Sequence, residues 1–400
     1  MSGATSGETH TMRPTRSPMR VRDMILTAVV ALIVLTLGLK KPSYNWDMIG
    51  YVAVAFSAEG YHGVDLNKAT YDSVRSEVNA STFDQWVQGD YRETVYRDPS
   101  SLAQQLPFYR IRVLYVGLVR MVHAIGFGYP RSTYVVSAAF AALSVVLLAL
   151  VGREIGAPVA AVPLVVAFSG FIDVAGLSTP DALACFCCLL TIHALVRESM
   201  LVFVVAALLP LVRTDLLLLS MLVCAHAFIF GKRTCALASM LVACMLYGLV
   251  VRINGAYGWL TLFNTSLIHK TAYPAALVPS HRLGDYLRPY VSLAYDFTMQ
   301  PHFVIFALAI WFLLRHGTRT LSSDMHRLSA VFVVPMAFVA LHLLLFPAIT
   351  YRFFVFAASV VAIGLIGQMQ WVNRSRHIQM RSVDADQRRR AHSLPPFQRR

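Results

Sequence analysis

Asp47 is the first residue whose type and surroundings favour catalysis. It directly follows Trp46, a few residues beyond the first apolar segment, and Tyr51 lies one helical turn further on. A carboxylate held beside aromatic side chains can act as a general base toward a hydroxyl group. The same position also suits the start of a helix over residues 48–58, which Asn45 or Asp47 would cap. The sequence leaves both roles open.

Asp181 closes the motif Ser-Thr-Pro-Asp at 178–181. This pattern predicts a helix start, with Ser178 or Thr179 as the cap and Pro180 at the first helical position. An acid in the first turn also suits the helix dipole. The helix is expected to open on the same face of the protein as Asp47. Converging carboxylates there would suit a substrate hydroxyl or a divalent cation.

Arg213 and Asp215 flank Thr214 and interrupt about thirty apolar residues. Residues two apart do not share a helix face, so each charge is expected to find a different partner. Buried charges in a membrane segment favour a functional role. Arg213 would then bind an anionic headgroup; a structural turn between two short helices is the alternative.

Three further arginines are expected on that same face. Arg110 and Arg112 lie in the stretch 106–127, and Arg352 opens the last apolar segment. The guanidinium group binds phosphate through two parallel hydrogen bonds. Together with Arg213 these residues are what a phosphate or diphosphate carrier needs, although any single arginine could instead extend to a lipid headgroup.

The elements that position these residues follow from the composition. The chain has 400 residues, of which 56% are hydrophobic and only 14% charged. A soluble domain carries about 25% charged residues, so most of this chain is expected to lie in lipid. The net charge of +14 is concentrated at the two ends, which indicates basic membrane flanks rather than nucleic-acid binding. The six cysteines all lie in apolar stretches without metal-ligand spacing.

The apolar segments predict an all-α, polytopic transmembrane helix bundle with about ten spans. A basic N-terminus (1–23) precedes a membrane domain (24–371), and an Arg-rich tail (372–400) is expected to be disordered. The predicted spans are 24–39, 132–151, 158–174, 180–196, 200–213, 215–230, 234–251, 299–314, 328–347 and 352–371.

The positive-inside rule predicts that both termini are cytoplasmic. The long segments 42–131 and 252–298 then lie outside, and 106–127, which carries several arginines, lies in the membrane interface. Two alternatives remain: 106–127 crosses as an eleventh span, or it crosses while 200–230 forms one bent helix at Pro210.

This organisation resembles the GT-C superfamily of membrane glycosyltransferases, which includes protein O-mannosyltransferases and the aminoarabinose transferases of lipid A. The matching features are Asp47 with Tyr51 in a long first outer loop, the interfacial stretch 106–127, Gly152-Arg153 after the second span, and Thr-Pro-Asp at 179–181. Arg213 and Tyr351-Arg352 are similar to later basic motifs of that superfamily. The chain departs from it in having Met48 after Asp47 instead of a second acid.

The resemblance implies transfer of a sugar from a polyprenyl-phosphate donor to a lipid or glycan acceptor at the outer face of a bacterial inner membrane. Asp47 would be the general base of an inverting reaction, and Asp181 would support the acceptor or a divalent cation (Mg²⁺ or Mn²⁺). Arg110, Arg112, Arg213 and Arg352 would bind the carrier phosphate, with Tyr51 and Asp215 also contacting substrate. Two other classes use the same arginines: a transporter or flippase of lipid-linked sugars, and an O-antigen-type polymerase.

Overall fold

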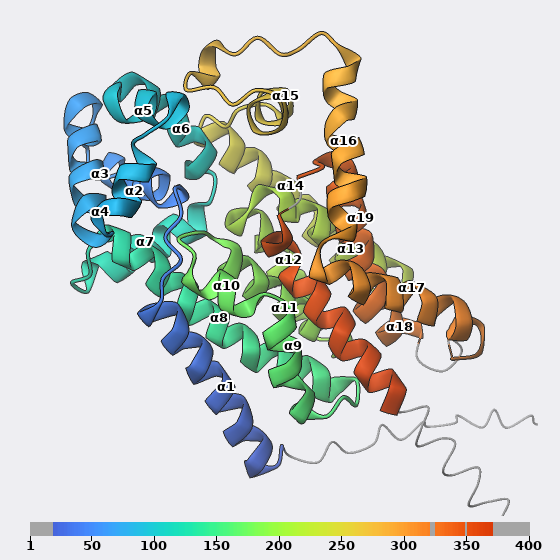
Figure 1. Ribbon diagram of the computed structural model, residues 1–400. Coiled ribbons are helices and arrows are strands. Elements are labelled where there is room, and N and C mark those ends of the chain that lie inside the picture. Colours follow the sequence, from blue (N-terminus) through green and yellow to red (C-terminus); the bar gives the residue numbers. More distant parts are fainter. Residues whose placement is uncertain (1–18, 321–324, 349, 371–400) are drawn as a thin grey trace, which may run out of the picture.

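The alternation of apolar stretches and short polar breaks produces a helical protein. The computed structural model describes residues 19–320, 325–348 and 350–370, and every regular element within these ranges is a helix (Figure 1). The all-α prediction is confirmed. A helix satisfies its backbone hydrogen bonds internally, which a segment in lipid requires. The basic tail 372–400 and most of the basic N-terminus (1–23) lie outside the described residues.

Five helical segments are long and apolar enough to cross a membrane, which indicates a membrane protein. They are α1 (Val21–Lys40), α8 (Tyr129–Glu154), α14 (Arg233–Ile253), Met325–Leu345 and Tyr351–Gln370. A sixth candidate consists of α16 (Leu283–Thr298) and α17 (Pro301–Thr320), which are bent by 82° at their junction.

The other predicted spans correspond to shorter helices. They are α9 (Val162–Phe168) with α10 (Phe171–Gly176), α11 (Asp181–Val196), α12 (Leu201–Val212) and α13 (Leu217–Ile229). Each is shorter than the ~20 residues that a straight crossing needs. Helix length therefore supports five or six spans, whereas the sequence predicts about ten.

Residues 42–131 fold into a layer of short helices at one end of the bundle, at the upper left of Figure 1. These helices are α2 (Asp47–Ser57), α3 (Gly63–Glu77), α4 (Ala80–Trp86), α5 (Asp90–Arg97), α6 (Pro99–Arg110) and α7 (Val113–Ala124). Both described ends of the chain lie at the opposite end of the bundle.

The stretch 106–127, predicted to lie in the membrane interface, does not form a single helix. It divides between α6 and α7, because Arg112 has a non-helical backbone (φ −94°, ψ 57°) and its Nη1 donates back to the carbonyl of Phe108 at 2.5 Å. The twelve-residue α7 is too short to cross and exposes Met121 and Leu114, as an interfacial helix does.

Candidate active site

Five charged side chains from four distant parts of the chain form one row of alternating sign. Arg352 Nη2 lies 3.2 Å from Asp47 Oδ2, and Arg352 Nε lies 3.2 Å from Asp181 Oδ2. Arg213 Nη1 donates to Asp181 Oδ1 at 2.6 Å, and Arg213 Nη2 donates to Asp215 Oδ2 at 2.8 Å. The structure thus brings together five of the eight residues selected from the sequence.

Asp47 is held by side chains and does not cap its own helix. It is the first residue of α2, and its carboxylate accepts hydrogen bonds from Tyr109 Oη (3.3 Å) and Asn45 Nδ2 (3.0 Å) in addition to its contact with Arg352. Tyr109 reaches Asp47 because residue 50 is a glycine: a Cβ there would collide with the Tyr109 ring. Burial, followed by the charge of Asp47, raises the pKa of Tyr109 well above its usual value, so the phenol remains a donor.

A short backbone contact joins the segment before α2 to the segment before α11. The backbone nitrogen of Ser43 donates to the carbonyl of Gly176, and the nitrogen of Ser178 donates to Asn45 Oδ1, both at 2.9 Å. Asn45 therefore contacts Asp47 with its nitrogen and the Asp181 segment with its oxygen. This double contact fixes the two carboxylates relative to each other.

Asp181 is almost fully buried, with a side chain 2% exposed. The predicted capping arrangement is wrong: α11 begins at Asp181, Pro180 precedes it, and no side chain caps the helix. Thr179 Oγ1 instead donates to Asp181 Oδ2 at 2.8 Å, and Ser178 Oγ accepts from Thr133. The Thr179 hydroxyl group thus holds the Asp181 carboxylate, and the Ser178 hydroxyl group binds Thr133 of α8.

Arg213 and Asp215 bind each other, contrary to the prediction of separate partners. Arg213 contacts Asp215 through both Nε (3.1 Å) and Nη2 (2.8 Å). The helical argument fails because Arg213 is extended (φ −151°, ψ 132°) and a 3-10 turn follows it, which brings residues two apart onto one side. His342 Nδ1 lies 3.5 Å from Asp215 Oδ2, and the Phe353 ring lies under the Arg213 guanidinium at 4.0 Å.

The three remaining candidates lie outside this row. Arg110 donates to Ser57 Oγ at 2.7 Å, and Arg112 donates to the carbonyl of Phe108. Tyr51 is buried between the rings of Tyr109 and Tyr115, whose centroids are 5.0 and 4.8 Å away. Tyr51 is therefore part of an aromatic layer that includes Tyr109, the partner of Asp47.

The row contains three carboxylates and two guanidinium groups, so its formal charge is −1. Arg352 lies between Asp47 and Asp181, where a divalent cation would have to sit. No three His, Cys, Asp or Glu side chains among the described residues gather closely enough to hold a metal ion. As arranged, these two carboxylates do not fit a Mg²⁺ or Mn²⁺ site.

Several residues of this site could not be predicted from the sequence. The sequence suggests Asn45 only as a helix cap, and it suggests no role for Tyr109 or His342. The signals were weak: Asn45 lies two residues from Asp47, and Tyr109 lies beside Arg110 in a proline-containing segment. Nothing in the sequence marks Gly50, because the residue that requires a glycine there, Tyr109, lies 59 residues later in the chain.

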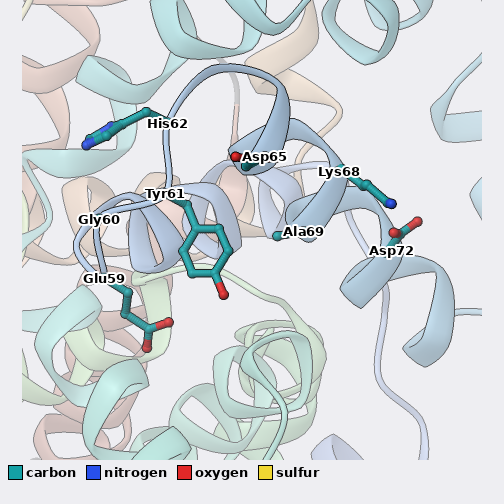
Figure 2. A pocket seen from close by; sticks show the side chains of 8 residues that line it. All are labelled: Glu59, Gly60, Tyr61, His62, Asp65, Lys68, Ala69 and Asp72. Carbon is teal, nitrogen blue, oxygen red and sulfur yellow. The ribbon is translucent and has the colours of Figure 1, made fainter.

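A separate hollow lies on the layer of short helices, between the end of α2 and α3 (Figure 2). It is lined by Glu59, His62, Asp65, Lys68 and Asp72, together with the smaller Gly60 and Ala69 and the ring of Tyr61. None of the five charged residues in the row contributes to it.

Comparison of the chain with protein-family models, curated proteins and solved structures yields no match.

Proposed function

We propose that this protein is an integral membrane glycosyltransferase that moves a sugar from a polyprenyl-phosphate donor to a lipid or glycan acceptor. One observation carries the proposal: a partly exposed carboxylate, Asp47, contacts Arg352, which comes from much later in the chain. A base and a phosphate-binding group at one place are what such a transfer needs.

The reaction follows from the contacts of Asp47 and Arg352. The acceptor oxygen attacks the anomeric carbon, and its proton passes to Asp47. The bond between that carbon and the phosphate oxygen breaks, and the electron pair leaves with the phosphate. Attack opposite the leaving group inverts the configuration, and Arg352 neutralises the charge on the departing phosphate.

Arg352 also explains how the base would be kept inactive before the donor arrives. Its guanidinium is bound by Asp47 and Asp181, and its side chain is 24% exposed. An incoming phosphate would compete for that guanidinium and free one oxygen of Asp47 to accept a proton. Arg213 is 5% exposed and bound by two carboxylates, so it would act mainly by holding Asp181.

The proposal includes a location. The protein would cross a bacterial inner membrane ten times, with both termini in the cytoplasm. Asp47 would then face outward, where lipid-linked sugars and acceptors meet. Support comes from the shared end of the two described termini, opposite the layer of short helices.

The test is transfer of labelled sugar from a polyprenyl-phosphate donor in membranes that contain Asp47→Asn. Loss of a general base lowers the rate by roughly 10²–10⁴-fold, while the protein remains folded. The matched control is Asp65→Asn, which neutralises an exposed carboxylate of the same layer. Full transfer by Asp47→Asn, with loss only in arginine variants, would show that Asp47 is not the base and would favour an O-antigen-type polymerase.

A further inference from the structure

A cavity lies between α16 and two segments that pack against it. Its volume is about 590 Å³, within the range of about 300–1,000 Å³ that small-molecule sites occupy. One face of α16 forms one wall, and the turn Asn264–Ile268 and residues 347–348 contribute the others. The polar side chains in its lining belong to Ser266, Asp285, Arg288, Ser292 and Asp296.

A buried asparagine holds the walls of this cavity together. Asn264 is 2% exposed, and its Nδ2 donates to Tyr286 Oη of α16 at 3.1 Å. Its Oδ1 accepts from the backbone nitrogen of Ser280 at 2.9 Å. The ring of Phe263 stacks on that of Tyr286, with centroids 5.4 Å apart. The cavity is therefore formed before a ligand arrives, as small-molecule sites usually are.

Most of the polar side chains in the cavity have no partner within the protein. Asp285 is the exception, because its Oδ2 accepts a hydrogen bond from Ser280 Oγ at 2.6 Å. Within the described ranges, no hydrogen bond or ion pair from the protein reaches the side chains of Ser266, Arg288, Ser292 and Asp296. In the row from Asp47 to Asp215, by contrast, every charged group has a partner of opposite charge. The cavity therefore has free hydrogen-bonding groups that the row lacks.

The lining of the cavity suits a ligand with many hydroxyl groups. The two carboxylates and the single guanidinium give it a formal charge of −1, which opposes the entry of a phosphate. Arginine donates, a carboxylate accepts, and a serine hydroxyl does both, as each hydroxyl of a sugar does. Leu267, Ile268 and Pro347 add apolar surface, against which the carbon atoms of a sugar ring can pack.

Hydrogen bonds attach the elements around the cavity to a helix that contacts the row of charges. Trp259 Nε1 of α15 (Trp259–Phe263) donates to the carbonyl of Leu345 at 3.1 Å, and Tyr290 Oη of α16 donates to the carbonyl of Leu344 at 2.8 Å. Both carbonyls lie at the end of α19 (Val334–Leu345), where the chain can no longer satisfy them. The same helix carries His342, which contacts Asp215.

The other wall of the cavity leads directly to Arg352. Ala348 lines the cavity four residues before Arg352, so their Cα atoms are at most about 14 Å apart, the length of four extended residues. Arg352 in turn contacts Asp47. A glycan of a few sugar units that is seated in the cavity is therefore long enough to extend to the row.

We propose that this cavity binds the sugar hydroxyl groups of the glycan acceptor, with Arg288 and Asp296 as its main contacts. The donor is the less suitable occupant, because it carries a phosphate next to its sugar and the cavity is negatively charged. The part that the cavity plays in transfer rests on the proposed function, whereas sugar binding itself does not.

Saturation-transfer NMR measures this binding without reference to activity. The purified full-length protein is kept in lauryldimethylamine oxide, a detergent without a sugar headgroup. The probes are the methyl glycosides of glucose, mannose, galactose, rhamnose, arabinose and N-acetylglucosamine, and methyl phosphate serves as the anionic probe. We expect saturable binding of at least one glycoside.

Substitutions in the cavity should weaken that binding. Arg288→Met and Asp296→Ala should each lower the affinity roughly tenfold or more, through loss of a hydrogen bond to a charged group. Ser292→Phe places a ring in the cavity, so it should abolish binding and raise the KM for the acceptor more than it lowers kcat. The matched controls are Arg282→Met and Ala294→Phe, since both positions are exposed and neither lines the cavity.

Three results would overturn the site. They are the absence of binding by every glycoside, equal binding in the cavity variants and their controls, and binding of methyl phosphate that Arg288→Met abolishes. Asp47→Asn separates this site from the catalytic proposal, because it leaves the cavity intact. Glycoside binding together with full transfer in that variant contradicts only the general base, and transfer by a protein that binds no glycoside contradicts only the cavity.

Discussion

The side-chain oxygen of Asn45 accepts a hydrogen bond from the backbone nitrogen of Ser178 across 133 residues of sequence, at 2.9 Å. The nitrogen of the same amide donates to Asp47. One small side chain thus determines the distance between the two acids of the site, Asp47 and Asp181.

Asn45→Ala should therefore reduce transfer more than its effect on stability explains. The substitution leaves the Ser178 nitrogen without its partner, at a cost of about 1–3 kcal/mol. The control is Asn79→Ala, which removes the cap of α4 at a cost of about 0.5–2 kcal/mol and lies away from the site. If Asn45→Ala and Asn79→Ala had the same melting temperature and lost the same activity, Asn45 would have no positioning role.

Gly50→Ala should displace Tyr109 from Asp47, because the added Cβ would occupy the position of the ring. We expect lower transfer and a melting temperature reduced by the overpacking, which typically costs 1–3 kcal/mol. Gly117→Ala in α7 is the matched control, since a Cβ there meets nothing within 4 Å. Unchanged activity in Gly50→Ala would mean that the Tyr109 contact is dispensable.

Asp181→Asn should be among the most destabilising single changes in the row. It removes one of the two carboxylates that neutralise Arg213, and both side chains are buried. Breaking a buried ion pair costs roughly 3–5 kcal/mol. Asp215→Asn should cost less, because the Asp215 side chain is 28% exposed and water can compensate. Thermal unfolding in detergent compares the two, and the reverse order would contradict this account.

A cysteine placed at residue 128 tests the side on which the loop after α7 lies. Gly128 is exposed and has a negative φ of −60°, so it accepts a side chain, whereas Gly126 has a φ of +108°. In intact cells Gly128→Cys should react with an impermeant thiol reagent. Labelling only after permeabilisation would mean that the segment before α8 is internal and that the proposed topology is wrong.

The long helices of this protein could be predicted well from the sequence, because a continuous apolar stretch of about 20 residues defines each of them. Val21–Lys40 and Tyr351–Gln370, for example, agree closely with the predicted spans 24–39 and 352–371. The break of 106–127 at Arg112 could not be predicted, since it depends on a side chain that bonds to its own backbone.

The row of charges could be predicted from the sequence only in part. Polar residues in apolar surroundings identified Asp47, Asp181, Arg213 and Arg352, because burial of an unpaired charge is costly. Their order in the row was not predictable, because it depends on the extended backbone at Arg213 and on the Asn45 contact.

The position of Arg352 near the end of the described chain has a consequence for biosynthesis. During translation Asp47, Asp181, Arg213 and Asp215 emerge first, and as a group they carry three negative charges and one positive charge. The row gains its second guanidinium group only when the segment Tyr351–Gln370 joins the bundle. Insertion of that segment is therefore the step that completes the ion pairs, so the row cannot form before these residues have been synthesised.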